Sequence, residues 1–278
     1  MIALPTLDPR VTWSVRVVDA ADGTTIAEHQ PHVQCETASI GKIFLLIEVA
    51  RRLEDGTLDP DERIEIPDEH RVEDSGLLYR MRDQSLGVHD AALLVGAVSD
   101  NLATNALIHL CGLESVRAVA PALGYEQTSL HDYIRNERTP DLPWTPSYGT
   151  AAELADLMRR LGAGEIFSPA VSARVLDWLA ADTDTSMTAD AFLLDPLAHV
   201  DAEYQGMTLR HKTGSVGFAR VDTGLLRGPA AGVAYTVAAN WKQSPTDLRA
   251  PVIDGMRDIG ERIRAHVTGL ARDETEHA

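Results

Sequence analysis

The sequence has few basic residues, especially lysines, and no long apolar run. Its 278 residues carry 25 Lys and Arg against 42 Asp and Glu, which gives a formal net charge of −17. An acidic surface repels phosphate backbones, so we expect no nucleic-acid partner. No stretch approaches the roughly 20 apolar residues of a membrane helix, so we expect no membrane association.

Cysteine is also scarce, because only Cys35 and Cys111 are present and they form no C-x-x-C pair. Two cysteines are too few for a disulfide framework, so we expect buried apolar thiols. No H-x-x-x-H pair falls on a plausible helix, and we expect no metal site and no cofactor. The N-terminus lacks the features of an export signal. As written, the sequence indicates a cytoplasmic protein, whereas a trimmed N-terminus would fit a periplasmic or secreted one.

Hydrophobic patterning predicts strands at both ends of the chain and helices between them. Residues 13–30 alternate around Asp22-Gly23, which is typical of a β-hairpin, and the runs after Gly206 predict an antiparallel meander. An apolar stripe from Val252 to Leu270 predicts a terminal helix that packs on the sheet. The intervening helices are expected near 87–98, 102–111, 114–123, 150–162 and 169–181.

This order of elements predicts an α+β fold in which an antiparallel sheet, built from both ends of the chain, is flanked by helices. We expect a single domain over residues 1–278. Its sheet lobe would comprise residues 1–36 and 206–278, and its all-helical lobe residues 37–205. A small-molecule site is expected in the cleft between the lobes, and a monomer is expected because no helical stripe demands a partner.

Ser39-Ile40-Gly41-Lys42 forms an S-x-x-K motif at the start of an apolar helix. Residues three apart on a helix lie about 5–6 Å from each other, so the lysine amine can reach the serine hydroxyl. A serine hydroxyl is a weak nucleophile until a neighbour accepts its proton. A desolvated lysine has a lowered pKa and can be that acceptor. Alone, the motif is equally compatible with Ser39 as a helix cap.

Two further motifs follow, Ser99-Asp100-Asn101 between apolar helical segments and Lys212-Thr213-Gly214 at the first late strand. Each has an ordinary explanation in isolation, the first as a helix break with an N-cap and the second as a strand end. Their order is more informative, because Ser99 follows Ser39 by 60 residues and Lys212 follows Ser99 by 113. A chance match of all three motifs is improbable.

S-x-x-K, S-D-N and K-T-G in this order are the signature of class A β-lactamases and penicillin-binding proteins, which the sequence resembles from about residue 13 to residue 270. The resemblance implies a bacterial serine hydrolase of antibiotic resistance. Such an enzyme would open the β-lactam ring through an acyl-enzyme on Ser39. The alternatives are a D-alanyl-D-alanine peptidase or an esterase with the same Ser–Lys pair, and a penicillin-binding module that is acylated without turnover.

The resemblance also implies the role of each motif residue. Lys42 would deprotonate Ser39, Ser99 would pass a proton to the departing lactam nitrogen, and Asn101 would contact the substrate amide. The backbone N–H groups of Ser39 and Ser215 would form the oxyanion hole. The substrate carboxylate would be bound at the third motif and just beyond it, by Lys212, Thr213, Gly214, Ser215 and Arg220. For Arg220, a solvated strand arginine is an equal alternative.

Deacylation is the step for which the sequence departs from the family. The resemblance implies a glutamate within R-x-E-x-x-L-N that activates the hydrolytic water. Residues 135–137 supply R-x-E, but Pro140 and Asp141 stand where Leu and Asn are expected. Glu137 is therefore either the water-activating base or a solvated loop carboxylate. A misplaced Glu137 would leave a persistent acyl-enzyme, as in a penicillin-binding protein.

The scarcity of lysine supports the site independently. Of the three lysines, Lys42 and Lys212 fall in the two motifs that require one, and only Lys242 has no assigned role. Arginine supplies positive charge elsewhere in the chain, but it cannot give up its proton and could not replace Lys42 as a base.

Overall fold

The computed structural model describes residues 1–270, with side chains for all of them but 204 and 205. At its centre is a five-stranded antiparallel sheet in the order β2-β1-β8-β7-β6. Thr12 on β1 pairs with Asn240 on β8, so the N-terminal hairpin joins the C-terminal strands as the sequence predicts. The strands are β1 (Thr12–Asp19), β2 (Thr25–His29), β6 (Thr208–Val216), β7 (Ala219–Arg227) and β8 (Gly232–Asn240).

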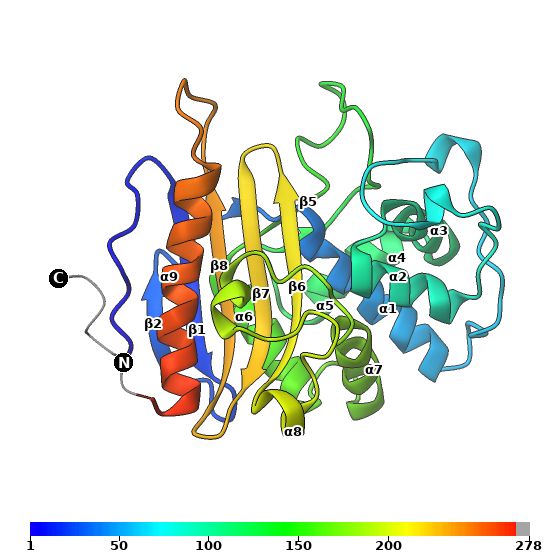
Figure 1. Ribbon diagram of the computed structural model, residues 1–278. Helices are drawn as coiled ribbons and strands as arrows, with labels where there is room; N and C mark the ends of the chain where they lie inside the picture. Colours follow the sequence, from blue (N-terminus) through cyan, green and yellow to red (C-terminus); the bar gives the residue numbers. More distant parts are fainter. Residues whose placement is uncertain (271–278) are drawn as a thin grey trace.

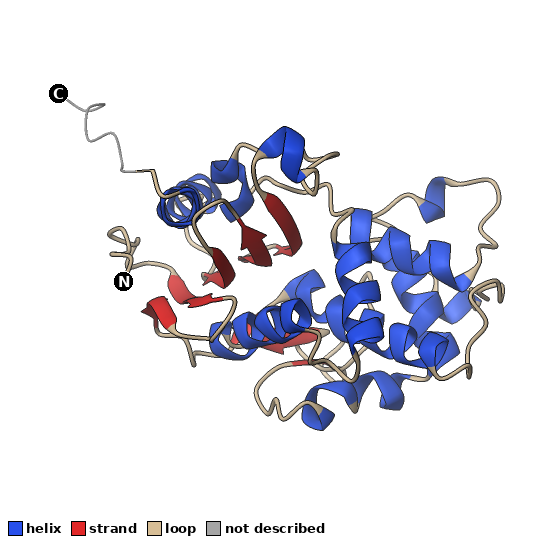
Figure 2. Ribbon diagram, turned by 90° about the horizontal axis from the view of Figure 1, so that it is seen from below, coloured by secondary structure: helices blue, strands red, loops and turns tan. Residues whose placement is uncertain are grey.

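Helices cover both faces of this sheet (Figures 1 and 2). On one face, α9 (Arg249–Thr268) packs together with the 3-10 helix η4 (Thr188–Phe192). On the other face, α6 (Ala151–Ala163) contacts β1 and β8. The apolar stripe predicted for the terminal helix is confirmed from Val252 to Val267, both of which are fully buried. Its predicted last member, Leu270, lies after the end of α9 and is 64% exposed. Within residues 1–270, no helix is both long and apolar enough to cross a membrane.

Most of the remaining helices form a group beside the β6 edge of the sheet (Figure 1). They are α1 (Lys42–Glu54), α2 (Val88–Val98), α3 (Asn101–Cys111), α4 (Leu113–Arg117), α5 (Val119–Ala122) and α7 (Pro169–Leu179). A small second sheet joins β3 (Cys35–Glu36), β5 (Ser147–Gly149) and β4 (Ser129–Leu130). Short elements complete the description: η1 (Ala38–Gly41), η2 (Asp68–His70), η3 (Leu78–Arg80) and α8 (Ala202–Gln205). The fold is thus α+β, as expected from the sequence.

The contacts divide the chain differently from the lobes expected at residues 1–36, 37–205 and 206–278. Both α6 and η4 fall within residues 37–205, yet they pack on opposite faces of the large sheet. One apolar cluster includes α1 together with Val221 and Ala238 of that sheet. Periodicity shows which side of a helix is buried, but it does not show which element buries it.

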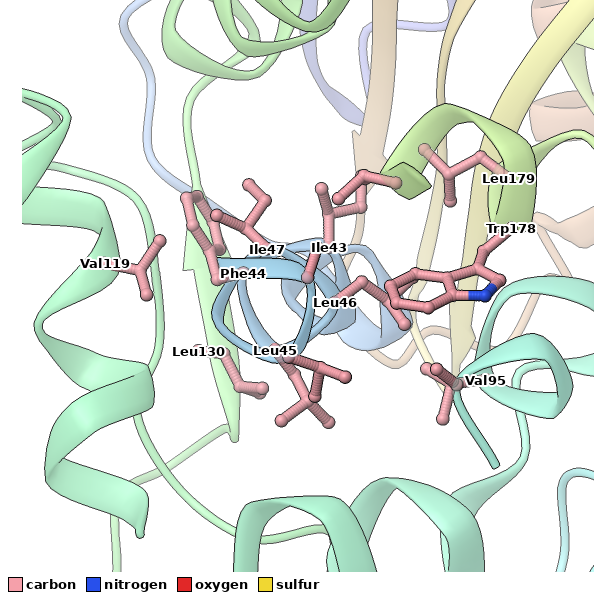
Figure 3. Packing of buried hydrophobic residues seen from close by; sticks show 14 of the residues in the cluster. Ile43, Phe44, Leu45, Leu46, Ile47, Val95, Val119, Leu130, Trp178 and Leu179 are labelled. Atoms are coloured by element: carbon pink, nitrogen blue, oxygen red, sulfur yellow. The ribbon is translucent and has the colours of Figure 1, made fainter. Parts of the chain in front are cut away.

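Helix α1 is the central element of the helical group. From Ile43 to Ile47, every side chain is at most 1% exposed. Figure 3 shows apolar side chains of several surrounding segments, including Val119, Leu130 and Trp178, packed around it. Close packing on all sides restricts movement of a helix. The site residues at the N-terminal end of α1 are therefore carried on a rigid element.

Candidate active site

A cleft of about 700 Å³ lies where the helical group meets β6. Residues of all three motifs line it, namely Ser39, Ser99, Asn101 and Thr213, together with Ser215, which follows the third motif. The fold therefore brings together the side chains that sequence reasoning selected from three distant segments.

Ser39 lies on η1, the turn that leads into α1. The helix itself begins at Lys42, and its N-cap is Gly41 without a side-chain hydrogen bond. Ser39 therefore does not cap α1, so the alternative explanation of the first motif, a helix cap, is wrong. The preceding residue, Ala38, has a φ of 49° in the left-handed region. Such a conformation costs about 1–3 kcal/mol and persists only where the surrounding structure enforces it.

Gly214 on strand β6 packs closely against this turn and helps to hold Ala38 in its left-handed conformation. A Cβ at Gly214 would lie 2.4 Å from the carbonyl oxygen of Thr37 and 3.1 Å from the backbone nitrogen of Ser39. Only glycine allows so close a backbone approach. The contact holds the turn that carries Ser39 against the strand that carries Ser215.

Lys42, the last residue of the first motif, is fully buried and contacts the second motif. Its Nζ donates hydrogen bonds to the Ser99 carbonyl oxygen and to Asn101 Oδ1, both at 2.7 Å, and lies 3.1 Å from Ser99 Oγ. Burial, followed by the charge of Lys212, lowers the pKa of Lys42 well below its usual value, against an opposing effect of nearby carboxylates. A neutral amine has two N–H groups and one lone pair. The carbonyl and amide oxygens can accept both N–H groups, which leaves the lone pair for a hydroxyl proton.

Asp100 fixes the second motif in place. As the N-cap of α3, its Oδ1 accepts from the backbone nitrogen of Ala103 at 2.9 Å. Its Oδ2 accepts from the backbone nitrogens of Leu77 and Leu78, each at 2.7 Å. The expected helix break with an N-cap is thus present, and it coexists with the site. Ser99, in the left-handed region at φ 54°, is held beside Lys42 by this arrangement.

We expect Asp100→Ala to destabilise the protein by about 2–5 kcal/mol, because it leaves three backbone N–H groups at a buried position without their acceptor. Urea unfolding followed by circular dichroism measures this loss. Asp100→Asn is the matched control, since it keeps one side-chain oxygen and should cost less. A loss below about 1 kcal/mol for the alanine variant would contradict this role of Asp100.

The third motif lies on the edge strand β6, where it contacts the loop after α7. Lys212 is fully buried, with Nζ 3.3 Å from Asp182 Oδ2. The same oxygen accepts from the backbone nitrogen of Thr213 at 3.2 Å, and Thr213 Oγ1 donates to Asp184 Oδ2 at 2.8 Å. Sequence reasoning missed both aspartates, because two aspartates after a predicted helix resemble an ordinary polar loop.

Arg220 does not line the cleft within the described part of the chain. Its guanidinium donates to the carbonyl oxygens of Val216 at 2.8 Å and Ala219 at 2.7 Å, and lies 5.8 Å from the ring centre of Trp241. These contacts hold the arginine on its own hairpin and leave it outside the cleft lining.

Glu137 is also outside the described lining, although Arg135, Asn136 and Arg138 contribute to it. Its side chain is exposed. An R-x-E pattern alone does not reveal which residues of this loop reach the cleft.

The loop residue that is fixed at the cleft is Ile134. Asn105 on α3 donates from Nδ2 to the Ile134 carbonyl oxygen at 2.8 Å, and its Oδ1 accepts from the Ile134 backbone nitrogen at 2.9 Å. Asp132 anchors the same loop by accepting from Arg135 and Arg138. Because Ile134 lines the cleft, the loop presents an apolar residue at this hydrogen-bonded position.

Neither cysteine offers an alternative nucleophile. Both are buried, as expected. Burial raises the pKa of Cys35 to about 11 and that of Cys111 to about 12. Both thiols are therefore protonated and unreactive at neutral pH.

The model of the beta-lactamase enzyme family, Beta-lactamase2, matches residues 6–267. Among solved structures, a beta-lactamase from Sphaerobacter thermophilus is 25% identical with a TM-score of 0.79, covering 94% of this chain and 93% of that one. A mutant class A beta-lactamase of the last common ancestor of Gram-negative bacteria is 26% identical with a TM-score of 0.75, covering 92% and 95%. PBP-A shares the fold at 22% identity and a TM-score of 0.75, covering 92% and 90%. No curated protein matches the chain.

Proposed function

The chain belongs to the beta-lactamase enzyme family, and from this premise we propose that Ser39 is the nucleophile with which it opens β-lactam rings. The chain is a β-lactam hydrolase by its family and by its likeness to beta-lactamases at 25% and 26% identity. The observation that carries the role of Ser39 is its place in the cleft, three residues before a buried lysine whose pKa is lowered. We further propose that it acts on a small molecule and as a monomer, the state expected because no apolar helical stripe of the sequence requires a partner.

In the acylation step, the neutral amine of Lys42 accepts the Ser39 hydroxyl proton as Oγ attacks the lactam carbonyl carbon. The backbone N–H groups of Ser39 and Ser215 donate to the developing oxyanion. When the C–N bond breaks, Ser99 gives its hydroxyl proton to the lactam nitrogen and regains one from the Lys42 ammonium. The 3.1 Å separation of Lys42 Nζ and Ser99 Oγ supports this relay.

In the deacylation step, water attacks the Ser39 ester and needs a base to accept its proton. The proposal that Glu137 is this base has only the R-x-E pattern in its support, because Glu137 is exposed and outside the described lining. The loop instead holds Ile134 at the cleft. We therefore propose that deacylation is the slow step of turnover.

Intact-mass measurement over time, after mixing with benzylpenicillin and separately with its methyl ester, tests this function. We expect a mass increase equal to the added compound, located on Ser39, followed by slow loss of the adduct as hydrolysed product accumulates. Ser39→Ala is the matched control and should form no adduct. Acylation that persists in Ser39→Ala, or no acylation of the unaltered protein by either compound, would refute the proposed nucleophile.

A further inference from the structure

The polar groups expected to bind a substrate carboxylate are already bound to carboxylates of the chain itself. Thr213 Oγ1 donates to Asp184 Oδ2 at 2.8 Å, and Lys212 Nζ lies 3.3 Å from Asp182 Oδ2. A substrate anion in the same place would compete with both aspartates for these donors.

Asp184 is held firmly in its position. Its Oδ1 accepts from the backbone nitrogen of Ser186 at 3.2 Å and from Ser186 Oγ at 2.6 Å. Burial raises the pKa of Asp184, but the hydrogen bonds from Ser186 and Thr213 and the charge of Lys212 outweigh it and lower the pKa overall. The carboxyl group is therefore ionised at neutral pH.

The other charged residues of the cleft add to the negative charge of Asp184. The described lining contains two basic side chains, Arg135 and Arg138, and both already donate to Asp132. It contains five acidic residues: Glu36, Glu73, Asp74, Asp182 and Asp184. The charge of Lys212 is offset by its contact with Asp182. The lining thus carries more negative than positive charge.

We propose that Asp184 is a specificity-determining residue that makes the cleft disfavour a substrate carboxylate beside Thr213 and favour a neutral or positively charged group there. This inference rests on the proposed acylation of Ser39. An anionic substrate would have to displace Asp184 from Thr213, or lie next to a like charge in a poorly solvated place. A protonated amine can instead pair with Asp184 while the contact with Thr213 remains.

Three forms of one β-lactam test the proposal because they share the ring and the acyl side chain. Benzylpenicillin is anionic, its methyl ester is neutral, and its 2-(diethylamino)ethyl ester is cationic at neutral pH. We expect the second-order rate constant for acylation of Ser39, from intact mass at low ionic strength, to be lowest for the free acid. Each ester should react at least about 10-fold faster, as expected for one unfavourable charge contact in a cleft.

Asp184→Asn is the deciding variant, since it keeps the size and an acceptor for Thr213 but removes the charge. It should speed acylation by the free acid at least about 10-fold, slow acylation by the cationic ester, and change the rate for the methyl ester less than about 3-fold. Asp177→Asn is the matched control. It removes one charge from an exposed residue of α7 outside the described lining, and the three rates should keep their ratios.

The outcomes separate this inference from the proposed function. A free acid that acylates the unaltered protein as fast as the methyl ester, or an Asp184→Asn variant with unchanged ratios, would overturn the role of Asp184 while leaving Ser39 as the nucleophile. If none of the three compounds acylates Ser39, the proposed function itself fails.

Discussion

Replacing Lys42 by arginine lowers the rate at which benzylpenicillin methyl ester acylates Ser39 by at least about 10³-fold, the scale of a lost general base. Arginine keeps its proton at every accessible pH, so it cannot accept the one from Ser39. Lys42 is buried beside Ser99 and Asn101. The decrease is measured by intact mass, with the methyl ester chosen because it lacks the carboxylate that Asp184 opposes.

The pH dependence of the same rate identifies the proton acceptor. Only the neutral amine is a base, so the rate in the unaltered protein should rise with pH through the lowered pKa of Lys42. It should reach its plateau well below 10.5, the ordinary value for lysine. Because the methyl ester does not titrate in this range, the increase in acylation rate with pH must come from a group of the protein. Lys42→Arg should show no such rise.

Two controls accompany this prediction. Lys242→Arg makes the same exchange at an exposed lysine and should leave acylation unchanged. Lys42→Met removes the amine without adding the bulk of a guanidinium, so it distinguishes a lost base from a disturbed core, and circular dichroism reports the fold of both variants. Acylation by Lys42→Arg within about 10-fold of the unaltered rate would assign the proton transfer to another group.

Ile134→Glu should shorten the lifetime of the Ser39 adduct by about 10²-fold or more, the scale of general base catalysis. Asn105 holds residue 134 through its backbone nitrogen and carbonyl oxygen, contacts that do not depend on the side chain. A carboxylate at this position would therefore enter the cleft and could accept a proton from the attacking water. The lifetime is measured by intact mass after removal of free benzylpenicillin methyl ester.

Ile134→Gln is the matched control, since it has the size and polarity of glutamate but cannot accept the proton. Equal acceleration by glutamine and glutamate would show that access of water, and not general base catalysis, limits deacylation. Glu137→Gln tests the base expected from R-x-E and should leave the adduct lifetime unchanged. A lifetime lengthened by Glu137→Gln would identify Glu137 as the base. It would contradict the proposal that the loop holds Ile134, and no effective base, at the cleft.

Much of the fold could be predicted because its strands and helices follow from the order of apolar and polar residues within short segments. The alternation around Asp22-Gly23 predicted the β1–β2 hairpin, and the steps of three and four from Val252 predicted the buried face of α9. The apolar residues after Lys42 predicted an apolar helix, which is α1. These features depend on periods of two or 3.6 residues and on the mean polarity of a short segment, which sequence shows directly.

Most of the site could also be predicted, since Ser39, Lys42 and Ser99 lie in short motifs whose chemistry depends on residue type. The sequence by itself thus determined the α+β class, the Ser–Lys pair and the family. Tertiary structure alone decided which loop side chains enter the cleft: Ile134 in place of Glu137, and Asp184 against Thr213. Those positions follow from contacts with α3 and β6, which lie far away along the chain. No local period encodes such contacts, because they exist only after the lobes have packed together.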